Sequence, residues 1–230
     1  MTYYGAKDMA TAFRTVRQNT IQTAQDIPED QFGFSAAKGC LTVAATLTHL
    51  AAGTNMSQML HGVDKRTHVA MEDFGAYMGQ AKEIEAALTS KAAIIEALTT
   101  RGEQYAAWLE TLTDEDLAEH VHFPAGFTPQ SKTRFEMLLG AKEHEMHHCG
   151  QLMVLQRLLG ITPHLTRRRQ EAMAARAAAA PGAPTAHAAS APSPASAAST
   201  ASVASGASAA STAPTPSAPT DAAGGAGAAR

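Results

Sequence analysis

The sequence predicts an all-α protein, a four-helix bundle with a disordered C-terminal tail. Apolar residues recur with the helical period over four long stretches, and convincing strand alternation is absent. Beyond residue 176 the chain is almost only Ala, Ser, Pro, Thr and Gly, and such a segment buries too little apolar surface to offset its ordering entropy. We therefore expect one domain at residues 1–176, long enough for a single core, and a disordered tail at residues 177–230.

Start and stop signals give the order of the elements along the chain. Pro28 ends the first helix, Ser131 is a natural N-cap for the last long helix, and Gly160 with Pro163 ends that helix. The predicted long helices cover residues 5–26, 42–61, 91–112 and 131–159. A less regular helix is expected at 74–88 and a last helical piece after His164. Connections are expected at 28–40 and 62–73, with a short helical turn and a loop at 113–130.

Charge and composition exclude several classes of protein. The formal net charge is −3 and no long run of Lys and Arg with interleaved aromatics precedes the tail, so nucleic acid is not expected as a partner. The short basic cluster at residues 166–170 is expected as a solvated helix start. The first residues carry charges where a signal peptide needs an apolar segment, and no stretch of about 18 apolar residues would span a membrane. Two cysteines, Cys40 and Cys149, make no disulfide framework, so we expect a cytoplasmic protein with free thiols.

The stretch EHEMHHCGQL, residues 143–152, carries the main candidates for chemistry. On a helix, His144 and His148 lie about 40° apart, one turn above the other, on a stripe that is otherwise apolar or small. The rest of that stripe is Met137, Gly140, Ala141, Gln151 and Leu155. Imidazoles at i and i+4 are a standard way to present two nitrogens to one metal ion, and the alternative is a pair of buried, hydrogen-bonded histidines.

A metal site needs a third ligand, and His49 is the best candidate. It stands in LTVAATLTHLAAGTNMSQML, an otherwise apolar and small-residue run in which a packed bundle would normally prefer Leu. The small residues Ala45, Thr46 and Gly53 leave space beside the imidazole, as an open coordination position requires. His147 lies about 60° from His144 and fits the stripe less well than His148, so it is expected at the boundary with a neighbouring helix.

Two further residues are candidates for a catalytic role. Glu145 lies about 100° from His144 on the helix. It is a carboxylate that accepts a hydrogen bond from a metal ligand, a general base, or a carboxylate at the surface or helix boundary. Gln151, one turn beyond His148, either binds a ligand, orients His148 or is a polar residue at the bundle mouth. The string HExxH also occurs in zinc peptidases, but the next downstream acid, Glu171, lies in a basic stretch and no strand-rich lobe is expected. A peptidase is therefore disfavoured.

The chain resembles the DinB-like family of small metal-binding four-helix bundles. The resemblance rests on the histidine of TLTHLA in the second helix and on KEHEMHHCGQLMVLQRLLG in the last long one, and it extends to FRTVRQNT and to SKTRFEMLLGAKEHEMHH. It covers about residues 1–175. It implies that His49, His144 and His148 bind one divalent metal ion. The chain departs from the family at Cys149, where members usually carry a basic or variable residue, often as HHRGQ; this thiol is not expected to join the metal.

The resemblance also implies a range of functions. Related proteins transfer low-molecular-weight thiols or isomerise small organic acids with a thiol cofactor, and many members have no known activity. We expect a metal-dependent transferase that activates a small-molecule thiol toward an electrophilic substrate; the alternatives are a non-catalytic metal-binding stress-response module and a metallohydrolase. Zn²⁺ or Ni²⁺ is the expected ion, and Co²⁺ or Fe²⁺ also suits imidazole. Exposed apolar helix faces further favour a homodimer.

Overall fold

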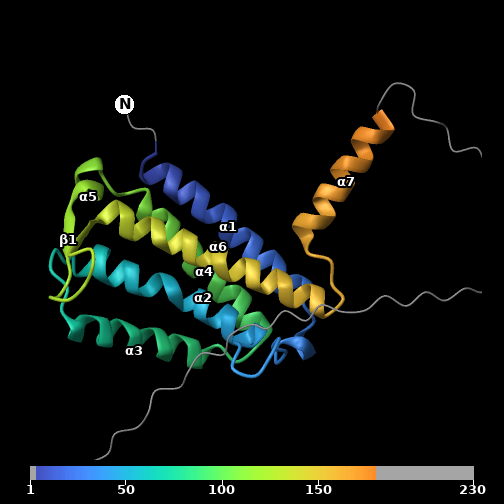
Figure 1. Cartoon of the computed structure of the whole chain (residues 1–230), viewed down its shortest axis with the longest axis horizontal. Helices are drawn as coiled ribbons and strands as arrows, with labels where there is room; N and C mark the ends of the chain where they lie inside the picture. The colour runs from blue at the N-terminus through green and yellow to red at the C-terminus, as the bar shows by residue number, and fades with distance from the viewer. Residues whose placement is uncertain (1–3, 180–230) are drawn as a thin grey trace, which may run out of the picture. The chain divides into compact units, whose positions relative to one another are not determined.

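The computed structural model describes residues 4–179, and four long helices form a bundle in it (Figure 1). α1 (Ala6–Asp26) and α2 (Val43–Ser57) each pack against both α4 (Lys91–Leu109) and α6 (Arg134–Leu158). The predicted all-α four-helix bundle is therefore confirmed. The predicted tail lies outside the described residues except at 177–179, which continue a helix, and the domain boundary at residue 176 stays a prediction.

Side-chain caps determine where the bundle helices begin. Thr42 and Ser90 each accept a hydrogen bond from the backbone N–H three residues on, at the starts of α2 and α4. At the start of α6, Thr133 accepts from the N–H of Glu136, and the Glu136 carboxylate accepts from the N–H of Thr133. The expected N-cap, Ser131, was therefore wrong by two residues, because Ser131 belongs to a strand that precedes the helix.

A small hairpin is the feature that the helical pattern did not predict. β1 (His120–His122) pairs antiparallel with β2 (Ser131–Thr133), so the expectation of no strand was wrong at this end of the bundle. Strands of three residues are too short to show alternation in a sequence. The short helical turn expected before the loop is confirmed as α5 (Asp114–Ala118).

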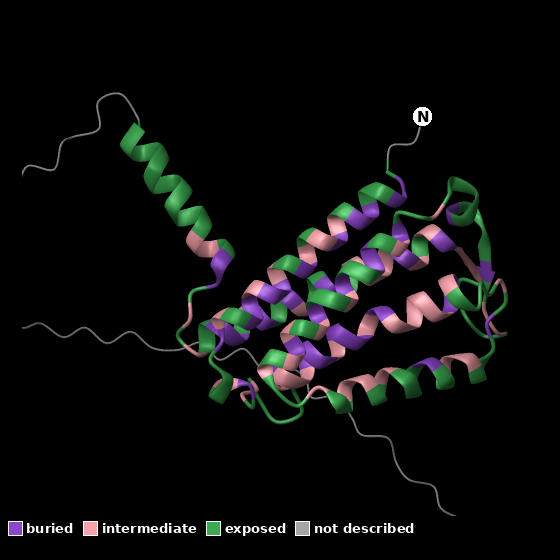
Figure 2. Ribbon diagram, turned by 180° about the vertical axis from the view of Figure 1, so that it is seen from behind, coloured by how far each residue is buried: buried purple, intermediate pink, exposed green. Residues whose placement is uncertain are grey.

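The region between α2 and α4 is more helical than expected. α2 continues into one π-helical turn, η2 (Gln58–Val63), and α3 (Met71–Ala87) starts three residues earlier than the predicted helix. α3 packs against α2, and Tyr77 is its one buried side chain. Figure 2 shows α3 mostly exposed or half-buried, in contrast to the buried faces of the bundle helices.

The remaining short elements follow the sequence pattern. One 3₁₀ turn, η1 (Glu29–Gln31), stands in the connection after α1. α7 (His164–Ala179) begins where a last helical piece was expected, and its arginines are exposed or half-buried, as predicted for the basic cluster. Figure 2 shows α7 exposed over most of its length, with its buried residue at the start.

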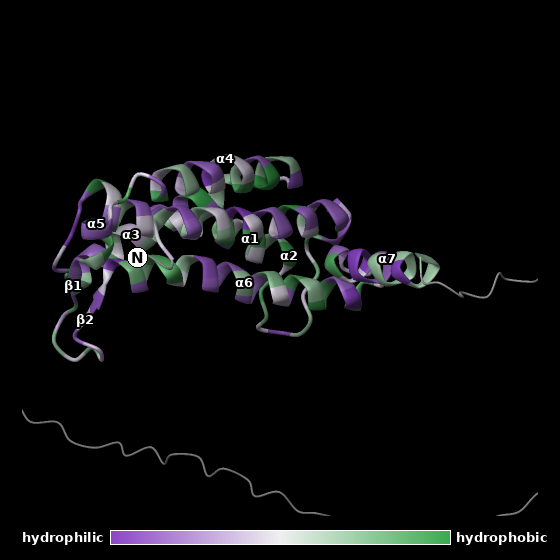
Figure 3. Ribbon diagram, turned by 90° about the horizontal axis from the view of Figure 1, so that it is seen from above, coloured by the Kyte–Doolittle hydropathy of each residue, from purple (hydrophilic) through white to green (hydrophobic). Residues whose placement is uncertain are grey.

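The core lies between the four bundle helices. Its members include Phe13, Leu47, Leu98 and Leu152, each at most 1% exposed. Hydrophilic and hydrophobic residues alternate around the bundle helices (Figure 3). Within residues 4–179, none of the helices is apolar over a sufficient length to cross a membrane.

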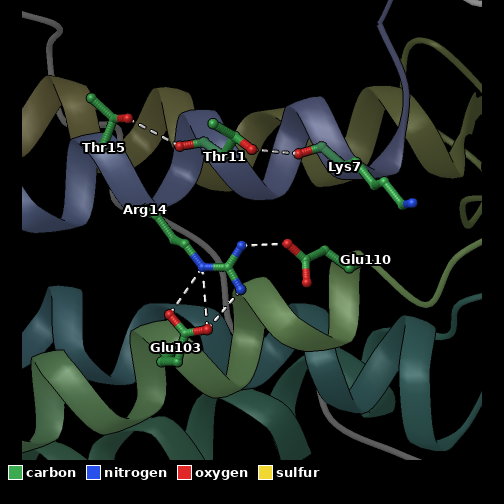
Figure 4. Close-up of polar contacts among 6 residues, drawn as sticks. All are labelled: Lys7, Thr11, Arg14, Thr15, Glu103 and Glu110. Atoms are coloured by element: carbon green, nitrogen blue, oxygen red, sulfur yellow. Dashed lines mark hydrogen bonds and ion pairs between the residues drawn. The ribbon is translucent and has the colours of Figure 1, made fainter.

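A surface network joins α1 to α4. The Arg14 guanidinium donates to Glu103 (Nε to Oε2, 3.0 Å) and also contacts Glu110, and two threonine hydroxyls on α1 bond back to the preceding turn (Figure 4). Because these groups are largely exposed, water and salt screen the ion pairs, which therefore contribute little to stability. The network therefore aligns two helices but does not account for the stability of the bundle.

One face of α6 carries exposed apolar side chains. Met146, Val154 and Leu158 are each more than half exposed and recur at multiples of four residues. Such spacing places them in one row along the helix. The expected homodimer stays a prediction.

Candidate metal centre

Three histidines from two helices converge at one point. His49 stands in the middle of α2, and His144 and His148 stand one turn apart on α6. The Nε2 atom of His144 lies 3.1 Å from Nε2 of His49 and 3.1 Å from Nε2 of His148. Among residues 4–179, these three side chains form the one group of His, Cys, Asp or Glu close enough to hold a metal ion together.

The spacing of the nitrogens fits a shared ion. Two nitrogens bound at 2.0–2.1 Å to one tetrahedral ion lie about 3.3 Å apart, close to the two distances found here. Hydrogen bonds alone explain the cluster less well, since Nε2 of His144 faces two nitrogens and carries at most one proton. The arrangement therefore has the donor atoms, number and spacing of a three-nitrogen metal site.

Two hydrogen bonds behind the cluster orient the rings. Nδ1 of His49 lies 3.2 Å from Oε1 of Glu85 on α3, and Nδ1 of His148 lies 2.7 Å from Oε1 of Gln151. An acceptor on Nδ1 holds the proton there and leaves the Nε2 lone pair free for a metal. Gln151 thus orients His148, one of the roles expected for it.

Glu85 was missed in the sequence. It lies on α3, and no local pattern sets the register of that helix against α2. The only signal in the sequence was a carboxylate in the last turn of a predicted helix. Acidic residues are common on exposed helix faces, so this signal did not single out Glu85.

The surroundings of His144 and His148 favour the neutral form of these two imidazoles. Burial, together with the neighbouring histidines, lowers the pKa of His144 to about 4. Burial is also the main reason that the pKa of His148 is lowered, although its bond to Gln151 opposes the shift. Neutral imidazole is the form that binds metals, so near pH 7 little proton competition is expected at these two rings.

His147 takes a different place from the three converging rings. Its Nε2 lies 3.0 Å from the amide nitrogen of Gln151, which makes it an outer neighbour of His148. The expectation that His148 rather than His147 faces His144 is in agreement with this geometry. His147 also lies beside the ring of His148, with the two centroids 5.2 Å apart, but its nitrogens are not among the three that converge.

Glu145 points into the core and not toward the histidines. Its Oε1 lies 2.6 Å from Nε of Arg17, and Nη2 of Arg17 donates to its Oε2 at 2.8 Å. Both side chains are at most 4% exposed, so of the alternatives left open for Glu145 the surface or boundary carboxylate is wrong. The helical wheel gave the correct angle away from the metal, but the partner is 128 residues away in the sequence. Burial raises the pKa of Glu145, and the guanidinium of Arg17 opposes that shift.

The neighbouring thiol is also turned away from the site. Cys149 is 5% exposed, and burial raises its pKa. A thiol in such surroundings is a poor nucleophile and a poor ligand. This agrees with the expectation that Cys149 does not join the metal.

A cavity of about 370 Å³ opens beside the histidines, between α2, α3 and α6. His49 and His144 form part of its wall, and Gly53, Gly140 and Ala141 leave the space that larger side chains would fill. Of the three residues expected to leave room near His49, only Gly53 lines the cavity. The prediction that Ala45 and Thr46 also leave room there was wrong. Both lie on the turn before His49, where the Thr46 hydroxyl donates a hydrogen bond to the carbonyl of Thr42.

Comparisons with known proteins were made for the sequence and for the fold. The model of the DinB superfamily matches residues 12–152, a span that holds all three histidines. The fold is similar to the crystal structure of a DinB-like protein, YjoA, from Bacillus subtilis, with a TM-score of 0.51 and 21% identity over 67% of this chain and 92% of that one. A mycothiol-dependent maleylpyruvate isomerase matches with a TM-score of 0.48 and 15% identity, over 66% of this chain and 63% of that one. None of the curated proteins matches the sequence.

Proposed function

Because the chain belongs to the DinB superfamily, we propose that His49, His144 and His148 bind one divalent metal ion, and that the site serves a metal-dependent transferase that activates a small thiol. One observation carries the proposal: three Nε2 atoms converge beside a cavity of about 370 Å³. Zn²⁺ or Ni²⁺ suits three nitrogens with a position left open for a ligand, and Co²⁺ or Fe²⁺ also suits imidazole.

The chemistry follows from three neutral ligands. When bound, a divalent ion keeps its full charge in such a site and lowers the pKa of a thiol beside it, so that a thiolate is available near neutral pH. Glu85 and Gln151 hold two of the imidazoles in place, and the cavity wall keeps water away from the electrophile and aligns it. With an epoxide, the sulfur forms a bond to carbon, the C–O bond breaks, and the oxygen takes up one proton for the one that the thiol gave up.

No cysteine of the protein takes part in this reaction. Cys149 is buried with a raised pKa, and Cys40 is exposed on the connection before α2. An exposed free thiol suits a reducing compartment, so we expect the protein in the cytoplasm. Cys149→Ser should keep the activity.

The two alternatives are less well supported. A metal-binding module without turnover needs no cavity beside the ion, and here a cavity shares two of its lining residues with the histidine cluster. A metallohydrolase of the HExxH kind needs the carboxylate of Glu145 as its base, and both oxygens of that carboxylate face Arg17. We therefore predict no metal-dependent hydrolysis of peptides.

Metal content of the purified protein tests the first half of the proposal. Replacing His49, His144 or His148 by Ala should each remove most of the bound metal, because three ligands leave no redundancy. His147→Ala is the matched control on the same helix and should keep it. Full metal content in His148→Ala together with its loss in His147→Ala would show that the ligand assignment is wrong.

Thiol consumption tests the second half. Low-molecular-weight thiols are incubated with an alkylating agent or an epoxide, with metal-loaded and with metal-free protein. Faster thiol loss with the loaded protein, absent in His148→Ala, is the expected result. If no reaction is accelerated and small thiols leave the visible spectrum of Co²⁺-substituted protein unchanged, the transferase is refuted and the non-catalytic module replaces it.

A further inference from the structure

The cavity beside the histidines has the same order of side chains on each of its three walls. One end carries the polar groups His49 on α2, His144 on α6 and Glu85 on α3. The other end carries one methionine from each of the same helices: Met56, Met137 and Met78. Small residues, Gly53, Gly140 and Ala81 among them, stand between the two ends. Two polar residues also line the cavity: Lys82, between the ends on α3, and Ser57, next to Met56.

The distance between the two ends is set by the helices. On each wall the methionine lies seven residues from the polar residue, as from 49 to 56, from 144 to 137 and from 85 to 78. Seven residues correspond to about 10.5 Å along a helix. Met56 and Met137 pack against one buried cluster, which includes Leu60 and Tyr77, whereas Met78 is 48% exposed. The cavity is therefore a slot with a polar end and an apolar end.

We propose that this slot holds the apolar body of a ligand, an alkyl or aryl chain of roughly eight to ten carbons. The head group of the same ligand reaches the three histidines. At about 30 Å³ for each group the size of a water molecule, 370 Å³ has room for about twelve such groups, enough for a chain of roughly eight to ten carbons and a small head group. Methionine side chains are flexible and polarizable, and so fit chains of different shape. Away from the histidine end, Ser57 and Lys82 are the polar side chains of the lining, so most hydroxyl groups of a sugar-like ligand would lack partners there. The identity of the head group as a thiol rests on the proposed function, whereas the apolar body does not.

Binding of straight-chain alcohols to metal-free protein tests the slot by itself. Titration calorimetry with alcohols of four to twelve carbons should show affinity rising about fourfold for each added methylene group, until the slot is full at eight to ten carbons. Affinity that does not depend on chain length would overturn the proposal. This measurement needs neither metal nor turnover.

Gly140→Leu is the variant that should block the slot. A Cβ added at Gly140 meets no other atom within 4 Å, and Gly140 lines the cavity, so we expect the leucine side chain to extend into it. Gly150→Leu is the matched control, since Gly150 stands on the exposed face of the same helix and also meets nothing within 4 Å. The length dependence should disappear in Gly140→Leu and persist in Gly150→Leu. A length dependence that survives in Gly140→Leu would place the alcohols elsewhere and refute the slot.

Met137→Ala should enlarge the slot, whereas Gly140→Leu fills it. A gain in affinity for longer alcohols could not result from misfolding, so this variant controls for a loss of structure. Removing this partly buried side chain lengthens the slot, so longer alcohols should now gain affinity. An unchanged length limit would contradict the assignment of the methionine end.

The same chain-length series with thiols and Co²⁺-substituted protein separates this proposal from the proposed function. If alcohols show the length dependence but no thiol changes the Co²⁺ spectrum, the slot is right and the thiol chemistry is wrong. If short thiols change the spectrum but longer ones bind no better, the thiol chemistry stands and the slot is wrong.

Discussion

The substitution Glu145→Gln separates a structural from a catalytic role for the glutamate of the HExxH string. Arg17 reaches all three of the other bundle helices: it bonds to Glu145 on α6, to the carbonyl of Leu98 on α4 and to the carbonyl of Leu50 on α2. The change to Gln keeps the size of the side chain and removes its charge. Arg17, which is 3% exposed, is then left as an uncompensated charge in the core.

The expected loss of stability is large. Removing one partner of a buried ion pair costs about 3–5 kcal/mol, because the remaining charge stays desolvated. For a domain the size of residues 4–179, with an unfolding entropy of about 2.1 cal/mol/K per residue, this corresponds to a fall in melting temperature of about 10 °C. Metal content should be unchanged, since Glu145 faces away from the histidines.

Thermal unfolding followed by circular dichroism, with metal analysis of the same samples, measures both effects. Glu143→Gln makes the same change on the exposed face two residues earlier and should shift stability by no more than about 0.5 kcal/mol. In the double variant Arg17→Met with Glu145→Met, stability should recover relative to either single change. A melting temperature of Glu145→Gln within about 2 °C of the wild type would refute the role of the ion pair. Loss of metal in Glu145→Gln but not in Glu143→Gln would place Glu145 in the metal site.

Three further predictions concern pH, the metal and the tail. Burial, together with an adjacent guanidinium, lowers the pKa of His61 from 6.5 to about 4. Between these two pH values the unfolded chain binds a proton that the folded chain does not, so the free energy of unfolding falls as the pH falls. Urea unfolding of metal-free protein should show about 2 kcal/mol lost from this group between pH 7 and pH 5, and His61→Gln should lack that part of the loss. Glu85→Gln should weaken metal binding about 10- to 100-fold in a chelator competition without changing the stoichiometry, whereas Glu83→Gln on the exposed face of α3 should not. Truncation after Arg176 should leave the melting temperature nearly unchanged, and a fall of several degrees would show that the removed residues pack on the bundle.

The parts of the site that the sequence predicts are those that depend on local spacing. His144 and His148 share a helical stripe whatever the rest of the fold does, and the apolar run around His49 marks that histidine as unusual in its own helix. The sequence also indicates that the two helices bring their histidines together, because both histidines lie on faces expected in the core, and the core faces of one bundle have few places to meet.

The parts that the sequence does not predict depend on contacts between distant segments. Glu145 has Arg17 as its partner, and Glu85 reaches His49 only through the position of α3 on α2. The hairpin at β1 and β2 displaced the expected start of α6 by two residues, although the helix itself was predicted. In each case the deciding term is tertiary packing, which overrides a correct local preference.

The light anchoring of α3 has a kinetic consequence. A helix held by one buried side chain, Tyr77, belongs to the least protected part of the fold, so its amide hydrogens should exchange with solvent well before those of α1 or α4. Because α3 forms one wall of the cavity, we expect its local opening, rather than global unfolding, to set how fast a ligand enters and leaves. The residence time of a ligand at the site should therefore follow the opening rate of α3. A substitution on the exposed face of α3 that stabilises the helix should lengthen the residence time without changing the ligand specificity.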